Sequence, residues 1–339
     1  GFKDRNFKYG LGATHFISRK KWTTISANYR NDIDQLGLQP DGITDFDNAN
    51  AFVALSQLGN LIRPFAYESI QVDLTSQVSK PFSFSLRLKN QDFTPLYDGF
   101  SYYTDPSDIN SPTGTNFTTT EATLKLKYAK DETFIINDNS RISLGTIRWP
   151  TFILGYTRGF KGSLGGDFDY NKLDFGISQR LKMGFWGISH YQITASRVFD
   201  EVPYPLLTAH IGNEQPVYAS FAFNTMNFYE FVSEQYVSLR YQHFFEGFIL
   251  NRIPLLKKLK WRLVASGNVL YGDISDKALA AQPTVDFLSL DPNKPYSEVG
   301  IGVENVFKFF RVDFFQRLTY LDNPDIKKRQ VKVSFNLSL

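Results

Sequence analysis

The sequence predicts an all-β protein, and more narrowly a transmembrane antiparallel up-and-down β-barrel of about 13 strands. Three observations predict this fold: a period of two in hydropathy, unusually long strands, and connections that alternate between short and long. In residues 331–339, for example, Val, Phe and Leu occupy the odd positions, and Lys, Ser and Asn occupy the even ones. Each strand therefore has one apolar face and one polar face.

Thirteen segments show this alternation along the chain. In order they are 6–17, 20–31, 66–78, 81–93, 119–130, 141–153, 170–184, 187–199, 234–248, 258–272, 297–306, 309–321 and 329–339. Many are longer than the ~5–6 residues of a typical soluble strand. They match the ~9–11 residues that a tilted strand needs to cross a bilayer.

The predicted connections alternate in length. Short ones fall near 18–19, 79–80, 131–140, 185–186, 249–257 and 307–308, and long ones at 32–65, 94–118, 154–169, 200–233 and 273–296, with a shorter member at 322–328. Short periplasmic turns and long external loops are typical of outer-membrane barrels. Aromatic residues near strand ends, such as Trp22, Trp149 and Trp186, suit an interfacial girdle.

The alternative fold is a pair of soluble β-sandwich domains, because sandwich strands alternate in the same way. Strand length favours the barrel over the sandwich. The polar faces also carry charges of both signs, as a water-filled lumen would. The whole chain, 1–339, is therefore interpreted as one outer-membrane barrel domain.

Strand parity adds an expectation about the complete protein. If the C-terminal strand ends in the periplasm, the long connections lie outside and the strand 6–17 starts outside. A closed barrel with both ends in the periplasm needs an even number of strands. We therefore expect one or three strands before Gly1, for a total of 14–16, and a chain that is the C-terminal part of a longer protein.

The composition excludes several classes of protein. Aromatic residues make up 16% of the chain, which argues against disorder. The net charge of +3 argues against a nucleic-acid partner. There is no Cys, and therefore no disulfide or Cys-ligated zinc. No cofactor and no metal site are expected.

One short motif lies in the predicted external connection 154–169. Arg158-Gly159-Phe160 resembles the conserved loop motif of the BamA-type and two-partner-secretion barrel superfamily. This resemblance implies that the loop folds back into the lumen, where Arg158 meets an acidic residue of the inner wall. A cation in a low-dielectric lumen needs such a partner, and the candidates on inward faces are Asp174, Glu246, Glu298 and Glu304. The alternative is an ordinary surface turn.

A wider set of segments resembles a narrower family. The segments are Arg158–Gly162, Asp167–Leu173, Val202–Leu207, Met226–Phe231 and Arg252–Leu259. They are similar to Bacteroidetes-type outer-membrane proteins of unassigned function that carry a carboxypeptidase-regulatory-like domain before the barrel. One departure from the BamA-type pattern is plain: about seven predicted strands follow the connection 154–169, whereas that superfamily has five.

Three further segments allow two interpretations each. Residues 251–259 form either a short helix that docks a partner or a turn that plugs the base of the barrel. Residues 202–233, rich in Pro, Tyr and Phe, either line a ligand site or pack on themselves. Asp41, Asp45 and Asp47 either bind calcium or form a solvated acidic loop; they lack the spacing of a dedicated calcium loop.

No catalytic site is expected. Nucleophilic catalysis needs a base, usually His, next to a Ser. Of the four His residues, His243 falls on the apolar face of its strand, and only His210 falls in a loop, where no nucleophile turn accompanies it.

The expected function follows from the resemblance. It implies an integral protein of the bacterial outer membrane that acts in outer-membrane protein assembly or transport. The alternatives are a passive pore or structural subunit of a larger outer-membrane complex, and a soluble β-sandwich binding module. The expected partners are outer-membrane lipid and other outer-membrane or periplasmic subunits.

Overall fold

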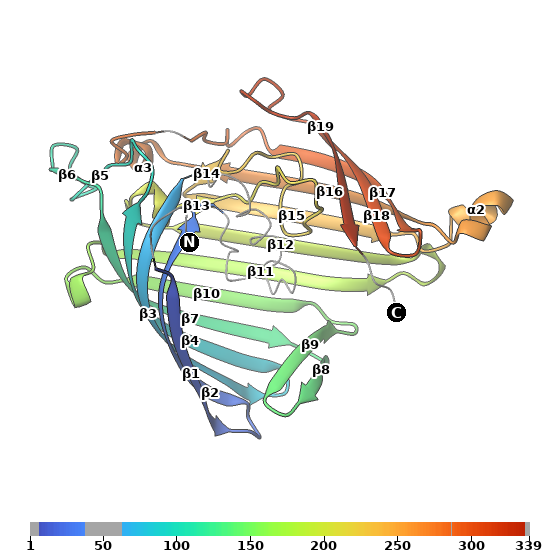
Figure 1. The fold of residues 1–339 in the computed structure, drawn as a ribbon, viewed down its shortest axis with the longest axis horizontal. Coiled ribbons are helices and arrows are strands. Elements are labelled where there is room, and N and C mark those ends of the chain that lie inside the picture. The colour runs from blue at the N-terminus through green and yellow to red at the C-terminus, as the bar shows by residue number, and fades with distance from the viewer. Residues whose placement is uncertain (1–6, 38–62, 286, 336–339) are drawn as a thin grey trace.

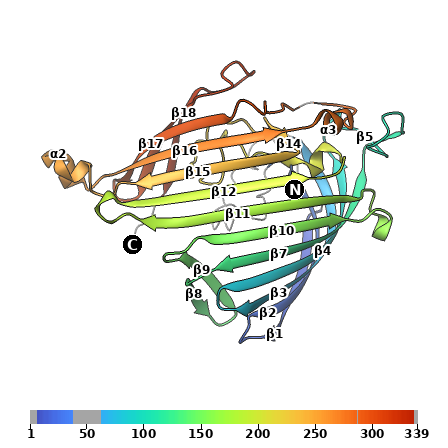
Figure 2. The same cartoon turned by 180° about the vertical axis from the view of Figure 1, so that it is seen from behind.

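A single antiparallel sheet of thirteen strands dominates the computed structural model, which describes residues 7–37, 63–285 and 287–335. Each main strand pairs with the main strand that follows it in the chain, so the topology is up-and-down. The sheet curls around an interior that holds a long connection between β12 and β15 (Figure 1). Its broad outer wall is seen from behind in Figure 2.

The strands of the main sheet are long, as the sequence predicts. They are β1 (Tyr9–Ser18), β2 (Thr23–Gln35), β3 (Pro64–Ser79), β4 (Phe82–Pro95), β7 (Phe117–Ala129), β10 (Thr151–Gly159), β11 (Tyr170–Lys182), β12 (Ile188–Val198), β15 (Gln235–Phe244), β16 (Arg262–Asp273), β17 (Tyr296–Val306), β18 (Phe310–Arg317) and β19 (Arg329–Phe335). Three two-stranded pairs lie outside this sheet: β5 (Tyr102–Tyr103) with β6 (Thr113–Gly114), β8 (Glu132–Asn137) with β9 (Ser140–Thr146), and β13 (Thr208–Ala209) with β14 (Val232–Ser233).

The period of two separates the two faces of the sheet. In β15, the apolar residues Val237, Leu239 and Tyr241 point outward and are exposed. The intervening Tyr236 and Ser238 point into the interior and are buried. An apolar outer face and a polar inner face are the reverse of a soluble protein, and they give the sheet the surface of a membrane barrel.

The sheet is not closed among the described residues, because β1 and β19 are its two edges and do not pair with each other. The edge of β19 is partly covered from within. The amide of Tyr218 donates to the carbonyl of Val333 at 3.0 Å, and the amide of Val333 donates to the carbonyl of Pro216 at 2.8 Å. The structure therefore has one curled sheet in place of the two packed sheets of a sandwich, and the sandwich alternative does not hold.

One predicted strand is misplaced. The segment 141–153 is not one strand: its first part is β9 in a hairpin with β8, and its last residues begin β10. The chain leaves the strand conformation between them, at residues 147–150, which end in Pro150. Alternation continues on both sides of this break, so the period alone does not reveal it. As a consequence, residues 154–159 are strand and the external connection shortens to 160–169.

Helices are short and few in the described residues. Besides single 3-10 turns there are α2 (Pro254–Leu259) and α3 (Asp276–Ala280). Neither is long and apolar enough to span a membrane. The predicted plug at residues 251–259 is not seen: α2 projects away from the sheet at the end that carries the short turns (Figure 1).

The outer face generates a test of its environment. Ile301 lies in the middle of β17, points outward and is 53% exposed. If this face contacts lipid, Ile301→Arg should lower the free energy of unfolding by about 2–4 kcal/mol in phosphatidylcholine vesicles. On a water-exposed surface the same change stays within about 0.5 kcal/mol. Urea unfolding followed by Trp fluorescence measures the difference, and Ile301→Leu is the control.

Candidate functional site

The Arg-Gly-Phe motif lies at the end of a strand. Arg158 and Gly159 are the last residues of β10, and Phe160 follows them. Arg158 shares the outward face with Leu154 and Tyr156, because the alternate residues of this strand line the interior. Its guanidinium pairs at 3.3 Å with Asp169 of the connection that follows β10; the Arg158 side chain is partly exposed and that of Asp169 is exposed. The expected inward fold of this loop is therefore not what the structure shows.

The four acidic candidates have partners other than Arg158. Asp174 accepts from Ser196 at 2.6 Å, and Glu246 pairs with Arg262 at 2.9 Å in the region of a short turn. Glu304 pairs with Arg311 at 3.6 Å. Glu298 is buried and binds a different inward connection, described below. The calcium candidates Asp41, Asp45 and Asp47 lie outside the described residues.

The segment that does fold inward is the connection between β12 and β15, residues 199–234, called the inner segment below. It carries β13, β14 and a 3-10 turn, η3 (Tyr204–Leu206). Many of its side chains are buried, including Tyr204, Phe223 and Phe231. It contains five Asp and Glu residues and no Lys or Arg. This acidic composition complements the cations of the wall that hold it.

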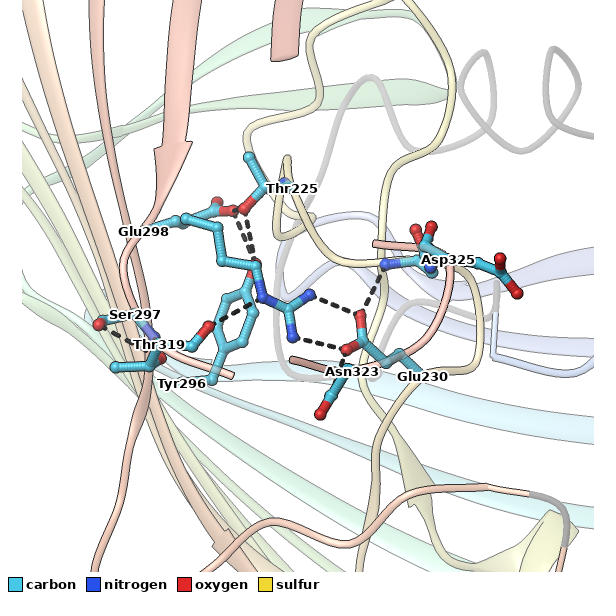
Figure 3. Close-up of polar contacts among 10 residues, drawn as sticks. Thr225, Glu230, Tyr296, Ser297, Glu298, Thr319, Asn323 and Asp325 are labelled. Atoms are coloured by element: carbon cyan, nitrogen blue, oxygen red, sulfur yellow. Dashed lines mark hydrogen bonds and ion pairs between the residues drawn. The ribbon is translucent and has the colours of Figure 1, made fainter. Parts of the chain in front are cut away.

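The first anchor is an ion pair between Glu230 of the inner segment and Arg317 of β18. Two parallel bonds join them, from Nη1 to Oε2 at 2.8 Å and from Nη2 to Oε1 at 2.6 Å. Asn323 also donates to Glu230 at 2.8 Å, as Figure 3 shows. Arg317 is only 1% exposed. Because a buried guanidinium is costly without a carboxylate, the position of Glu230 fixes this part of the inner segment.

The second anchor is Glu298 of β17, which is 1% exposed. Its carboxylate accepts from the backbone amide of Asn224 at 2.7 Å. It also accepts from the backbone amide of Thr225 at 2.7 Å and from the Thr225 hydroxyl at 2.6 Å, and Figure 3 shows Thr225 beside Glu298. Asn268 of β16 and Tyr296 of β17 also donate to it. An inner-wall carboxylate that receives several N–H donors binds a loop firmly without any cation from the loop.

The third anchor lies at the last strand. Lys332 of β19 is buried, and its ammonium donates to the carbonyls of Asn213 at 2.7 Å and Gln215 at 2.6 Å. The next residues of the inner segment pair with the edge of β19 at Val333. The same short stretch therefore satisfies a buried cation and the unpaired backbone of an edge strand.

His210 links the two ends of the inner segment. It is buried, and its Nε2 lies 2.8 Å from the hydroxyl of Ser233. Its ring packs edge-on against Tyr236 of β15. Burial, and after it the nearby charge of Arg240, lowers the pKa of His210 to about 3. The imidazole is therefore neutral in the folded protein at ordinary pH.

A cavity of about 340 Å³ remains between the inner segment and the sheet. Its wall is polar and charged and includes Lys89 of β4, Glu121 of β7 and Lys172 of β11. Its lid is more apolar and comes from the inner segment, with Tyr204 and Leu207 among its residues. Aromatic residues such as Phe93 and Phe117 line the same cavity, so the interior is charged in part and aromatic in part, and it is largely filled by protein.

A Ser–His contact exists on the outer face. The hydroxyl of Ser189 lies 2.8 Å from Nδ1 of His243 and 2.9 Å from the hydroxyl of Tyr241. Nε2 of His243 lies 2.9 Å from the carbonyl of Trp186. Ser189 is buried, so its hydroxyl is covered, and the contact holds the turn between β11 and β12 against β15. Among the described residues no cluster of His, Asp and Glu is arranged to hold a metal ion.

Sequence reasoning identified Glu298 as an inward acidic residue but missed Glu230, Arg317 and Lys332. Arg317 and Lys332 lie on the polar faces of predicted strands, where charges are common. The signal that would have found the inner segment is its composition: 36 residues with five carboxylates, no cation and many Phe and Tyr. The Phe and Tyr residues of such a segment disfavour exposure to solvent, and its carboxylates disfavour contact with lipid. Burial inside the protein therefore requires cations from elsewhere in the chain.

Comparison with known proteins agrees with this architecture. Residues 1–277 match the family profile described as Family of unknown function (DUF5686) C-terminal domain. The structure of BamA from Haemophilus ducreyi lacking POTRA domains 1–3 aligns with a TM-score of 0.57 and 11% identity. The alignment covers 96% of this chain and 62% of that one. At this identity the likeness is one of fold.

A second solved structure, OccK11 (OpdR) from Pseudomonas aeruginosa, aligns over 92% of this chain and 77% of that one. Its identity is 11% and its TM-score is 0.29, which is too low to inform the fold. No curated protein matches this sequence.

The ion pair generates the first prediction about the site. Glu230→Gln leaves the Arg317 guanidinium buried without its counter-ion, which should cost about 3–5 kcal/mol. We expect the inner segment to undock, with faster hydrogen exchange at residues 223–233. Arg158→Ala, which breaks an exposed pair, should change exchange by less than about 1 kcal/mol equivalent. Glu230→Gln combined with Arg317→Met should recover part of the lost stability of the docked segment. Equal exchange rates in Glu230→Gln, Arg158→Ala and the double variant would contradict the role of the ion pair as an anchor.

The second prediction concerns pH. In the unfolded chain His210 binds a proton below a pKa of ~6.5, whereas in the folded chain it stays neutral down to about 3. Docking of the inner segment should therefore be fully stable above pH 6.5 and weaken as pH falls below it, by at most about tenfold per pH unit. Hydrogen exchange of residues 208–211, corrected for intrinsic rates, measures this. His210→Gln should remove the dependence, and an unchanged slope would contradict it.

Proposed function

We propose that this chain, which belongs to the family described as Family of unknown function (DUF5686) C-terminal domain, is an outer-membrane β-barrel domain gated by its inner segment. Its role is the transport of a substrate or the assembly of proteins at that membrane. The observation that carries the proposal is the way the inner segment is held. Its anchors to the wall are charged and non-covalent, so a partner that replaces them releases it.

Two features support insertion in the outer membrane. The outer face of the sheet is apolar over strands such as β15 and β17, where Leu239 and Ile301 are exposed. The fold also aligns with the barrel-containing chain of BamA over nearly the whole length of this protein. Because this chain spans only 62% of that one, the activity and partners of BamA are not transferred with the fold.

The position of the inner segment supports a role in transport or assembly. Five strands, β15 to β19, follow it in the chain. Five is the number that the BamA-type resemblance gives for the strands after its inward loop. The number of following strands agrees with that resemblance when residues 199–234 are taken as the inward loop, although the Arg-Gly-Phe motif itself lies at 158–160.

We propose four further properties for this protein. They are a Bacteroidetes-type origin, a carboxypeptidase-regulatory-like domain before the barrel, the absence of enzymatic activity, and partners that are lipid or other subunits of a membrane complex. A passive pore or structural subunit is the second candidate function. The polar cavity favours it, because water and small solutes fit between the inner segment and the wall.

A reversible lock distinguishes these functions. Residues 1–339 contain no Cys. With any Cys outside them replaced by Ser, Val217→Cys with Val333→Cys creates one possible disulfide, at residues that form a parallel bridge. In planar bilayers we expect the full-length protein to be mostly closed and Glu230→Gln to open it. The oxidised lock should suppress that opening, and a reductant should restore it.

A passive pore predicts steady conductance that neither the lock nor Glu230→Gln changes. The insertion itself is tested first, by heat-modifiable gel migration of the full-length protein from an outer-membrane fraction. A soluble protein with no boiling-dependent shift would overturn the proposed function.

A further inference from the structure

The two ends of the sheet carry opposite charge. The end called the short-turn end contains the connections 19–22, 80–81, 130–150, 183–187, 245–261 and 307–309. These hold twelve Lys and Arg against four Asp and Glu. Apart from the inner segment, which folds into the interior, the described residues of the long connections hold six Lys and Arg against nine Asp and Glu. The net charge of +3 conceals this polarity.

The short-turn end also carries every Trp of the chain. Trp22, Trp149, Trp186 and Trp261 fall in four different connections at this end. Cations accompany them: the ammonium of Lys130 lies 4.1 Å from the ring centroid of Trp149. Trp favours the boundary between lipid and water, and a rim of Trp marks that boundary on a barrel.

The helix α2 extends this surface. Its connection includes four cations, Arg252, Lys257, Lys258 and Lys260, all exposed. Ile253 and Leu259 of the same connection are about half exposed. Figure 1 shows α2 projecting beyond the ends of the neighbouring strands. A short element with exposed cations and exposed aliphatic residues suits the surface of an anionic bilayer.

We infer that the short-turn end binds the headgroups of an anionic phospholipid leaflet through this basic, Trp-containing rim and α2. The inference rests on the proposed function, because it requires the sheet to span a membrane. Cations and Trp are spread over connections around the sheet, and a leaflet meets the whole perimeter of a barrel. An acidic protein would contact one patch. Basic segments next to a membrane attract anionic lipids over about a Debye length.

The distribution of Trp provides the probe. All four Trp of residues 1–339 lie at the short-turn end. With any Trp outside these residues replaced by Phe, intrinsic fluorescence reports on the lipids at that end alone. The full-length protein is reconstituted in phosphatidylcholine vesicles with about one third phosphatidylglycerol. Bromine is carried either by the phosphatidylglycerol or by an equal amount of phosphatidylcholine. We expect brominated phosphatidylglycerol to quench roughly two-fold more strongly, because it is enriched around the rim.

The variants assign the effect to the rim. Lys257→Gln/Lys258→Gln/Lys260→Gln should reduce the excess quenching, and about 0.5 M salt should abolish it. The matched control, Lys294→Gln/Lys327→Gln/Lys328→Gln in the long connections, should leave it unchanged.

Each outcome decides a different point. Equal quenching by the two brominated lipids, with normal insertion, overturns the inference and leaves an acidic protein as the occupant of this surface. No quenching by either lipid means that the rim lies outside the bilayer, and it overturns the proposed function as well.

Discussion

The arrangement of the interior depends on one pair of charges, Glu230 and Arg317. Arg317 projects from β18 into a space from which water is almost excluded, and a guanidinium there is stable only with a carboxylate in bonding distance. The carboxylate comes from residues 199–234, which lie far from β18 in sequence. Glu298 and Lys332 repeat this logic with backbone groups as partners. The polar wall and the inner segment are therefore complementary halves of one interior.

The inverted surface of the sheet explains why the inner segment must be polar where it meets the wall. Strands with apolar residues outside place their charged residues inside, and burial under the inner segment gives those charges little water. An apolar plug would leave Arg317 and Lys332 unpaired. The inner segment instead supplies carboxylates and carbonyls to the charged groups of the wall, and its Phe and Tyr residues pack against apolar and aromatic side chains of the wall and of other connections. Its lack of Lys and Arg avoids repulsion from the wall.

The sequence was sufficient for the sheet and insufficient for the site. Strand number, direction and faces follow from local alternation, which needs no knowledge of distant residues. The sequence does not predict the break between β9 and β10 near Pro150, because the alternation of apolar and polar residues continues on both sides of it. The inward loop was assigned to 154–169 because three residues resembled a motif, yet Arg158 falls in the outward register of β10 and finds Asp169 beside it. The alternation places Glu298 on the inner wall, where the structure has it. Its partners are the backbone amides of Asn224 and Thr225, and a sequence does not indicate which backbone amides will bind a carboxylate.

The anchors also determine how the inner segment could leave. Undocking at Glu230 uncovers Arg317, and undocking at residues 213–218 uncovers Lys332 together with the backbone edge of β19. Each of these groups costs free energy when it loses its partner, and partial release gives it no new partner. We therefore expect the anchors to open together. A partner that favours the open state must bring an anion for Arg317 and strand-like backbone for β19. An extended acidic segment would supply both the anion and the backbone groups. Water alone would not stabilise the exposed Arg317 and the β19 edge as well as the inner segment does.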